Sequence, residues 1–529
     1  MMDAYNCCFL SRPRRFGKTL LLDTINELFR GHRELFKGLW IDSAEVGYDF
    51  KRHPVIQLNM GHARTDSPND LEKHIVSGLM AVARKEGVET KGEFYDIILG
   101  RLLQRLSEKY GTKAVVLVDE YDAPVTGHVE NLAVARANGG LLLDFCTALK
   151  ANIANIRFAL VTGVTRFALT AMDSGPNNFH DLSLDPEYGG VCGFTISEFD
   201  HYFGDRMGGT LKALIEKGQM AAGAQESDLR ERIMAWYDGY NWLGPERVLN
   251  PYSILNFFNE MKFGPYWPRT GRPGHLSALI QEKPLDFVQP RLDGYADGEL
   301  TRAEIGTLEA APVLFDSGYL TIDESRWVEE GEGDDMGQHE LYSLRLPNKE
   351  VRGSYRTDCL DAIFRRSPAY LRGLGPRFLD AVSGRDSMAF ARLFGDILAT
   401  ITYRRHGDRE KYYHGLIHAS LIATGLEVRG ESAGAVGRSG LVVCLAEERR
   451  LVIEVKYRTA KKKEPVADQA RERILDAAAD LACEAIIEKD CLGPFRLRGG
   501  EAIGLGLAVY GRKDVKARFL EEYAARLLP

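Results

Sequence analysis

The stretch Ser11-Arg12-Pro13-Arg14-Arg15-Phe16-Gly17-Lys18-Thr19 follows an apolar run at Cys7 to Leu10. It leads into a segment from Gly17 to Phe29, in which apolar residues recur at helical spacing, and Gly31 supplies a stop signal. A short buried strand, a tight turn and an amphipathic helix in this order predict the beginning of an α/β domain.

Further apolar runs continue this pattern along the chain. They lie at Val55 to Leu58, Val115 to Val118 and Phe158 to Val161, with helical segments such as Leu141 to Ile153 between them. Such alternation is typical of a parallel sheet with crossover helices, because strands buried on both faces are almost continuously apolar. We therefore predict a P-loop NTPase domain with a parallel sheet over residues 1–205.

The turn in the opening stretch has the composition of a phosphate-binding loop. Gly17, Lys18 and Thr19 supply the end of the P-loop motif, in which backbone N–H groups surround phosphates, the Lys reaches the β and γ phosphates and the hydroxyl binds Mg²⁺. The first glycine of the motif is absent, because Arg12 occupies its position. We expect ATP and Mg²⁺ to be bound by Arg12, Pro13, Arg14, Arg15, Phe16, Gly17, Lys18 and Thr19.

An acidic pair directly follows the apolar run at Val115 to Val118. Asp119 ends this predicted strand and Glu120 comes next. A carboxylate at the end of a buried strand lies beside the P-loop threonine, so we expect Asp119 to hold Mg²⁺ together with Thr19. We expect Glu120 to be the catalytic base that polarises the attacking water, while Lys18 acts on the phosphates.

The run at Phe158 to Val161 ends in Thr162. In ATPases with the extra Glu, a strand between the P-loop strand and the acidic strand carries a polar residue that senses the γ-phosphate. Thr162 suits this catalytic role, and simple termination of the strand is the alternative. Arg166 lies just beyond and is a second candidate for a phosphate contact.

The middle of the chain has a different pattern. Residues 206–300 are helical and aromatic, and we interpret them as a lid or connecting domain. Residues 301–355 contain helical patterns followed by strands at Tyr319 to Ile322 and Leu341 to Leu346, separated by an acidic, Gly-rich loop. Helices followed by two strands predict a winged-helix module.

Residues 375–529 change from helical signals to strands at Leu441 to Cys444, Arg450 to Val455 and Ala502 to Val509. Glu454 and Lys456 stand two positions apart on the second strand, so their side chains share one face. A pair of this kind occurs in metal-dependent nucleases, and an exposed surface ion pair is the alternative.

Several motifs together resemble the bacterial AAA-ATPase-like family that is usually fused to a PD-(D/E)XK nuclease-like domain. They are Ser11 to Thr19, Val118 to Asp122, Val161 to Phe167, Ser174 to Asn178, Tyr237 to Tyr240, Asn250 to Ser253 and Gly318 to Thr321. The resemblance covers essentially the whole chain and implies that an Arg-Pro-Arg-Arg loop replaces the first glycine. Family members carry some tens of residues before the P-loop strand, so we expect an N-terminally truncated ATPase domain with an incomplete adenine pocket.

The same resemblance implies an α/β nuclease-like fold over residues 375–529. In that family Mg²⁺ lies between an Asp on one strand and the Glu of an ExK on the next. Where the family has Gly-Arg-Ser-Asp-Leu, this chain has Gly437-Arg438-Ser439-Gly440-Leu441. We therefore expect a degenerate, nuclease-silent site, and an Asp introduced at position 440 to restore a metal ligand. The implied site residues are Glu410, Gly440, Glu454, Lys456 and Gln469.

Composition limits the remaining possibilities. The net charge of −7 argues against coating of nucleic acid by the whole molecule, but residues 401–463 hold 13 Lys and Arg against 7 Asp and Glu. This segment is the candidate for DNA binding. The eight cysteines include no CxxC pair, so no zinc site is expected. No apolar run reaches the roughly 18 residues of a membrane span, and a cytoplasmic location without membrane contact is expected. Nothing in the sequence supports a homo-oligomer.

Three functions are compatible with these features. The preferred one is an ATP-binding and ATP-hydrolysing P-loop switch coupled to a degenerate nuclease-like domain that faces nucleic acid. The first alternative is an active ATP-regulated, Mg²⁺-dependent DNA endonuclease. The second is a non-catalytic interaction protein that binds nucleotide.

Overall fold

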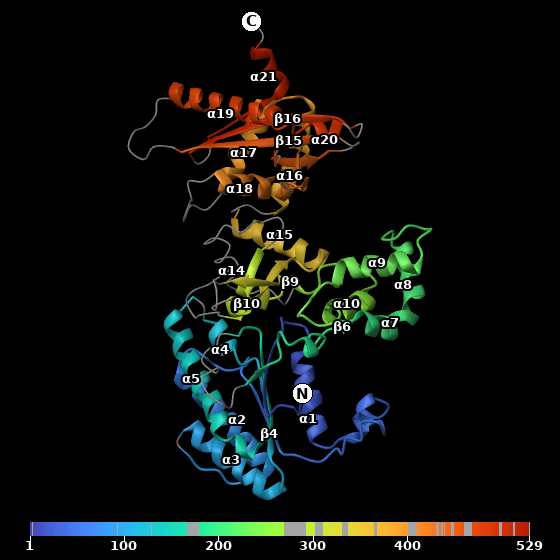
Figure 1. Ribbon diagram of the computed structural model, residues 1–529, viewed down its shortest axis with the longest axis vertical. Helices are drawn as coiled ribbons and strands as arrows, with labels where there is room; N and C mark the ends of the chain where they lie inside the picture. The colour runs from blue at the N-terminus through green and yellow to red at the C-terminus, as the bar shows by residue number, and fades with distance from the viewer. Residues whose placement is uncertain are drawn as a thin grey trace. The chain divides into compact units, whose positions relative to one another are not determined.

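Figure 1 shows the computed structural model of the chain. It describes residues 1–529 except 3, 93, 129, 167–178, 269–291, 302–309, 331–336, 364–367, 400–409, 430–432, 435–436, 439, 446–448, 460–467, 497–499, 512–513 and 528–529. The described residues up to Ser354 form one compact unit, and those from Tyr355 onwards form a second.

The first unit is built on a parallel sheet of five strands in the order β2-β3-β4-β1-β5. Its strands are β1 (Cys7–Ser11), β2 (Val55–Asn59), β3 (Ala114–Asp119), β4 (Ile156–Gly163) and β5 (His180–Asp181). The predicted parallel sheet is confirmed. The expected position of β4 between β1 and β3 is confirmed as well, and it brings the carboxyl ends of these three strands to one edge.

Helices cover both faces of this sheet (Figure 1). Cys8 and Leu10 of β1 pack in a core with α1 (Lys18–Phe29), whereas Cys7 and Phe9 face the opposite core. Successive strand residues point to opposite faces, so an unbroken apolar strand supplies both cores. The opposite core contains α2 (Pro68–Glu86), α3 (Tyr95–Tyr110) and α5 (Leu132–Ala151). Short elements are η1 (Arg33–Phe36), η2 (Trp40–Asp42), α4 (Ala123–Thr126) and η3 (Ile153–Asn155).

Among the described helices, α5 has the length and composition that would let a helix cross a membrane. Its residues Leu142, Phe145 and Leu149 are buried in the core that also contains α2 and α3. Packing against the sheet therefore accounts for its apolar face.

An aromatic core holds the next part of the first unit together. The rings of Phe203 and Phe258 stack with centroids 4.8 Å apart, and Phe257 packs edge-on against Phe258. The elements around this core are β6 (Phe194–Thr195), α7 (Ile196–Phe203), η5 (Gly204–Arg206), α8 (Met207–Glu216), α9 (Glu226–Tyr237), β7 (Val248–Leu249) and α10 (Pro251–Glu260). They follow η4 (Pro186–Tyr188), whose Tyr188 packs in the core with Cys8 and Leu10.

A three-stranded antiparallel sheet in the order β8-β10-β9 follows. It comprises β8 (Leu292–Ala296), β9 (Thr321–Glu330) and β10 (Gly337–Arg345), with α13 (Asp297–Thr301) and α14 (Ala310–Asp316). The predicted strand Tyr319 to Ile322 was too short at one end, because β9 continues to Glu330. The loop was predicted at Glu329 to Gly337; Glu329, Glu330 and Gly337 pair within β9 and β10 instead, and residues 331–336 lie outside the described residues.

The second unit has its own five-stranded sheet, in the order β11-β14-β15-β16-β17. β15 and β16 are parallel and joined through α19, while the other neighbours are antiparallel. The strands of this sheet are β11 (Glu427–Arg429), β14 (Leu441–Cys444), β15 (Arg450–Arg458), β16 (Ala502–Tyr510) and β17 (Asp514–Phe519), while β12 (Ala433–Gly434) and β13 (Gly437–Arg438) form a separate antiparallel pair. The helices of this part of the chain are α15 (Lys349–Ile363), which begins in the first unit, and α16 (Pro368–Ser383), α17 (Ser387–Leu398), α18 (Glu410–Ala423), α19 (Asp468–Glu488), α20 (Gly493–Arg496) and α21 (Leu520–Leu527).

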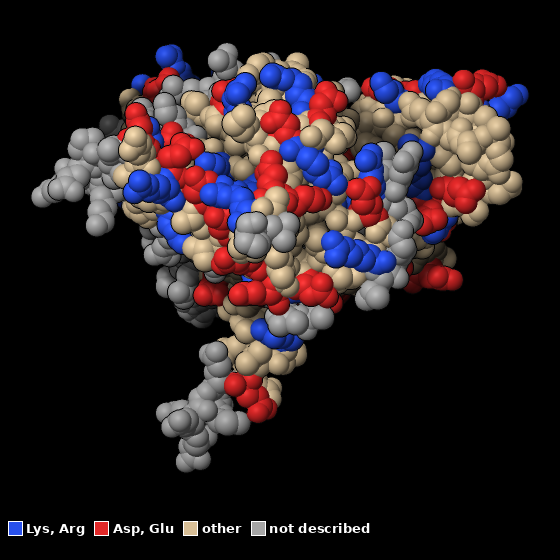
Figure 2. All heavy atoms as spheres, turned by 90° about the horizontal axis from the view of Figure 1, so that it is seen from above, with Lys and Arg blue, Asp and Glu red and all other residues tan. Residues whose placement is uncertain are grey.

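Basic and acidic side chains alternate over the face of the molecule in Figure 2, without an extended area of one sign. Six of the 13 Lys and Arg residues of the basic segment 401–463 lie outside the described residues. Arg404, Arg405 and Arg409 are among them.

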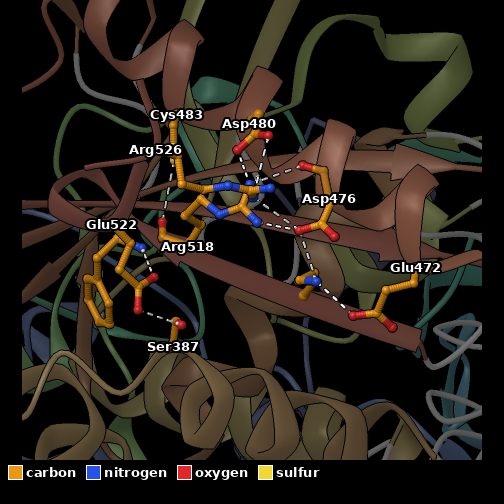
Figure 3. Close-up of polar contacts among 10 residues, drawn as sticks. Ser387, Glu472, Asp476, Asp480, Cys483, Arg518, Glu522 and Arg526 are labelled. Carbon is orange, nitrogen blue, oxygen red and sulfur yellow. Dashed lines mark hydrogen bonds and ion pairs between the residues drawn. The ribbon is translucent and has the colours of Figure 1, made fainter. Parts of the chain in front are cut away.

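One face of α19 is attached to β17 and α21 by charged side chains. Glu472, Asp476 and Asp480 recur every four residues and therefore lie on one face of the helix. The guanidinium of Arg518 is nearly buried, with 7% of its side chain exposed, and pairs with both aspartates, as Figure 3 shows. Arg526 of α21 contacts the same two aspartates but is 53% exposed.

The substitution Arg518→Met should lower the free energy of unfolding of the second unit by about 2 kcal/mol. This is less than the roughly 3–5 kcal/mol expected for breaking a fully buried pair. The difference arises because Asp476 and Asp480 remain 27% and 29% exposed. Arg526→Met, the matched control at an exposed arginine, should cost at most about 1 kcal/mol. Denaturant unfolding measures both, and equal losses would contradict the importance of burial.

Candidate functional site

The carboxylate of Asp119, at the end of β3, accepts hydrogen bonds from residues at the ends of the neighbouring strands β4 and β2. Its Oδ2 accepts a hydrogen bond of 2.6 Å from Oγ1 of Thr19, which lies in the first turn of α1. Its Oδ1 accepts one of 2.8 Å from Oγ1 of Thr162 in β4. Asp119 is 1% exposed and Thr162 is 0% exposed. The structure thus brings together the P-loop threonine, the acid and the strand-tip threonine that the sequence singled out.

Two further donors complete the surroundings of Asp119. Nδ2 of Asn59, at the end of β2, lies 3.3 Å from Oδ2, and the backbone N–H of Glu120 donates to Oδ1 over 3.0 Å. Sequence reasoning missed Asn59, although a polar residue directly after the apolar run 55–58 is the same signal that identified Asp119.

Lys18 lies inside the turn of the P-loop. Its Nζ donates to the backbone oxygens of Arg12 and Pro13 over 2.7 and 3.0 Å. Burial lowers the pKa of Lys18, and the nearby carboxylate of Asp122 opposes this shift. Gly17, with φ of 97°, takes the left-handed conformation that lets the turn enter α1.

Arg12 anchors the loop to the protein. Its guanidinium donates to the backbone oxygens of Ser11, Ser183, Tyr188 and Val191. Burial lowers its pKa to about 10. A buried guanidinium needs acceptors for its donors, and Arg12 finds them in these carbonyls. The nucleotide contact expected for this side chain stays a prediction.

The remaining loop residues differ in exposure. Pro13 and Phe16 are buried, whereas the side chains of Arg14 and Arg15 are exposed, with the Arg15 guanidinium 5.0 Å from the centroid of the Tyr252 ring. Arg14 and Arg15 are therefore the two arginines of the loop whose charge is accessible from outside.

Glu120 follows Asp119 in a left-handed backbone conformation, with φ of 51°. Its carboxylate lies over Gly61, where an added Cβ would come within 1.6 Å of Oε2. A non-glycine residue in this conformation is held there against its preference, and such residues concentrate at functional sites. Glu120 is exposed beside the buried Asp119, as a group that acts on water must be.

Asp122 fixes the loop that follows β4. Its carboxylate accepts hydrogen bonds from the backbone N–H groups of Val164 and Thr165 and from the Thr165 hydroxyl. The Tyr121 hydroxyl donates to the backbone oxygen of Thr165 over 2.9 Å. The motif Val118 to Asp122 therefore both carries the acid pair and positions the loop next to Thr162, a role that sequence reasoning did not assign.

Arg166 is buried next to two acids. It lies 3.8 Å from Asp181 and 3.8 Å from Asp316, and the guanidinium nitrogens make no hydrogen bond among the described residues. Burial raises the pKa of Asp316 to about 7, and Arg166 opposes this shift only in part. Arg166 was predicted from the sequence as a candidate phosphate contact. In the structure its buried guanidinium pairs with Asp181 and Asp316.

The ExK residues lie on β15 of the second unit. Oε1 of Glu454 accepts a hydrogen bond of 3.0 Å from Nζ of Lys489 and lies 3.5 Å from Nζ of Lys456. Gly440 comes next to this carboxylate, since an added Cβ would lie 3.0 Å from Oε2 of Glu454. Lys489, which follows α19, was missed by the sequence interpretation.

Two of the other implied residues of this site lie at the beginnings of helices. Gln469 is exposed in the first turn of α19, and Glu410 begins α18, with its side chain outside the described residues. Ser439 also lies outside the described residues. Within the described part of the chain, no group of three or more His, Cys, Asp or Glu residues is placed to hold a metal ion.

Comparison with known proteins agrees with the first site. A family described as predicted AAA-ATPase matches residues 1–173. An uncharacterized protein in the vnfD 5' region of Azotobacter chroococcum mcd 1 is 32% identical over 443 residues, which cover 82% of this chain and 80% of the relative. No solved structure matches. These matches support nucleotide binding by the first unit and do not support the nuclease-like fold of the second.

The buried Asp316 should make stability depend on pH. Between about pH 4 and about pH 7 the folded state retains a proton that the unfolded state has released. The contribution of Asp316 to stability is therefore fully present at low pH and falls as the pH rises through this window. The loss of unfolding free energy from about pH 5 to about pH 8 should be smaller in Asp316→Asn than in the wild type. Parallel curves for the two proteins would contradict the assignment.

Proposed function

We propose that the chain is an ATP-binding and ATP-hydrolysing switch. It belongs to the same family as the Azotobacter chroococcum protein, and its residues 1–173 match the predicted AAA-ATPase family. Its site comprises Lys18, Thr19, Asp119, Glu120 and Thr162. The observation that supports this proposal most strongly is the pair of hydrogen bonds that Asp119 accepts from Thr19 and Thr162.

Each residue has a distinct task in the proposed reaction. The Thr19 hydroxyl and the Asp119 carboxylate would hold Mg²⁺, which neutralises charge on the phosphates. The ammonium of Lys18 would exchange the two loop carbonyls for phosphate oxygens. Glu120, exposed beside Asp119, would accept the proton of the attacking water, while the Thr162 hydroxyl lies at the tip of the neighbouring strand.

Lys18→Ala and Glu120→Gln should separate binding from hydrolysis. Lys18→Ala removes the cation that meets the phosphates, so ATP binding and turnover should be lost together. Glu120→Gln keeps the shape of the site and removes the base, so binding should persist while turnover falls by about 10²–10⁴-fold. Titration with ATP and a phosphate-release assay measure the two quantities. Equal turnover by wild type and Glu120→Gln would remove Glu120 as the base.

For the second unit we propose a nuclease-like scaffold without nuclease activity, which faces DNA. The order α18, β14, β15, α19, β16 and the pair of Glu454 with Lys456 on one strand support the nuclease-like interpretation. The ammonium of Lys489 on Glu454, and a glycine where the family has an acid, support the absence of a metal. We also propose that residues 301–355 form a winged-helix module.

DNA as a partner depends on the basic segment 401–463. The ATPase rate with and without DNA distinguishes this proposal from its rivals. Stimulation by DNA without cleavage supports a switch, Mg²⁺-dependent cleavage supports a working endonuclease, and nucleotide binding without turnover supports a non-catalytic interaction protein.

The wild type should not cleave DNA with Mg²⁺ or Mn²⁺, because Glu454 faces Lys489 and Lys456 and belongs to no group of three or more potential metal ligands among the described residues. The backbone as it lies argues against the expected repair by Gly440→Asp. An added Cβ would come within 2.0 Å of the Ile453 carbonyl oxygen, so a side chain requires the strands to move. Gly440→Asp should therefore lower the melting temperature and leave the protein inactive. Metal-dependent cleavage by the wild type that Glu454→Ala abolishes would overturn this proposal.

A further inference from the structure

The P-loop is packed against parts of the chain that follow it by more than 170 residues. Each of its residues from Arg12 to Phe16 contacts a different set of side chains or carbonyls of the first unit. Arg12 lies over the Trp242 ring at 4.4 Å, Arg15 lies over Tyr252, and Phe16 packs edge-on against Tyr240 at 4.8 Å and Trp242 at 5.1 Å. A P-loop usually consists of small residues, whereas the P-loop of this chain packs against several large side chains.

Trp267 makes the contact with the middle of this loop. Its indole Nε1 donates to the backbone oxygen of Arg14 over 3.2 Å, and the side chain is fully buried. The ring packs edge-on against Tyr319 at 5.1 Å. Gly318, in the left-handed conformation, fits between Trp267 and Pro13, since an added Cβ would lie 3.3 Å from the indole and 2.8 Å from Pro13. Trp267 thus touches the loop directly and through Gly318.

Glu350 holds Trp267 from the other side. Its Oε1 accepts the backbone N–H groups of Tyr266 and Trp267 over 2.6 and 2.9 Å, and its Oε2 accepts the Ser253 hydroxyl over 2.8 Å. Glu350 is 1% exposed and lies in the first turn of α15. Asn348 accepts the N–H of Val351 at the beginning of the same helix.

α15 (Lys349–Ile363) is the helix in which the chain passes from the first unit, which ends at Ser354, to the second, which begins at Tyr355. The path Arg14, Trp267, Glu350 therefore consists of hydrogen bonds donated by the buried Trp267 and ends on the helix that continues into the second unit.

We propose that Trp267 and Glu350 are positioning residues that couple phosphate binding at the P-loop to α15. The proposal rests on the proposed nucleotide site. Lys18 must release the carbonyls of Arg12 and Pro13 to reach phosphates, so the carbonyls of this part of the loop change partners when nucleotide binds. The neighbouring carbonyl of Arg14 is the acceptor of the buried indole, and a buried donor does not tolerate the loss of its acceptor. The loop and the segment that carries Trp267 therefore move together.

Hydrogen exchange of the full-length protein tests this coupling. In the wild type, saturation with the non-hydrolysable analogue AMP-PNP and Mg²⁺ should change amide exchange in residues 348–355, as well as in the P-loop. Trp267→Phe removes the indole N–H and keeps an aromatic ring, so the P-loop should still respond at saturation while residues 348–355 should not. Trp242→Phe is the matched control, because Trp242 contacts Arg12 and Phe16 but makes no hydrogen bond to Glu350 among the described residues, and it should keep the response of α15.

A second variant pair covers the case in which Trp267→Phe does not fold. Coupling is reciprocal, so Glu350→Ala, remote from the loop, should change the affinity for AMP-PNP by roughly 5-fold or more. Glu350→Gln keeps an oxygen for the two backbone N–H groups and should restore the wild-type affinity. An unchanged affinity in Glu350→Ala, or an unchanged α15 response in Trp267→Phe, would overturn the coupling. Failure of the wild type to bind AMP-PNP at all would instead overturn the nucleotide site itself.

Discussion

Burial of the Asp119 carboxylate is the constraint on which the first unit depends. A buried charge is costly unless donors surround it. Here the donors are the hydroxyls of Thr19 and Thr162, the amide of Asn59 and a backbone N–H. These groups come from α1, β4, β2 and the residue after β3, so the order of the strands in the sheet is what satisfies the charge. A sheet with another order would leave Asp119 without one of its hydroxyls.

The second constraint is the bulk of the P-loop. Small residues at these positions would let the loop stand free on the sheet, whereas arginine, proline and phenylalanine need partners for their charge and apolar surface. Those partners are supplied by the motifs around Tyr240, Tyr252 and Gly318, which are far apart in sequence. The P-loop has arginine in place of the first glycine, and its bulky residues pack against the aromatic motifs downstream. These two features therefore belong to one packing arrangement.

The sequence was sufficient to predict which residues gather at the sheet edge, because the carboxyl ends of parallel strands coincide and Lys18, Thr19, Asp119 and Thr162 all lie there. It was insufficient where the direction of a long side chain decides the role. Arg12 points to carbonyls of residues 183–191, and Arg166 to buried acids, which no local pattern reveals. Glu350 and Lys489 were missed for the same reason: their partners are set by tertiary contacts. The length of β9 was missed because pairing with β10 overrides its acidic composition.

In the second unit, the contact that holds α19 to the sheet is separate from the surroundings of Glu454. The charged face of α19 is held to β17 by Arg518, and this contact does not involve Glu454. Glu454 is buried, so its carboxylate needs a cation, and Lys489 supplies one from within the chain. In the proposed function of this unit, the ammonium of Lys489 would also offset the charge that attracts a divalent ion.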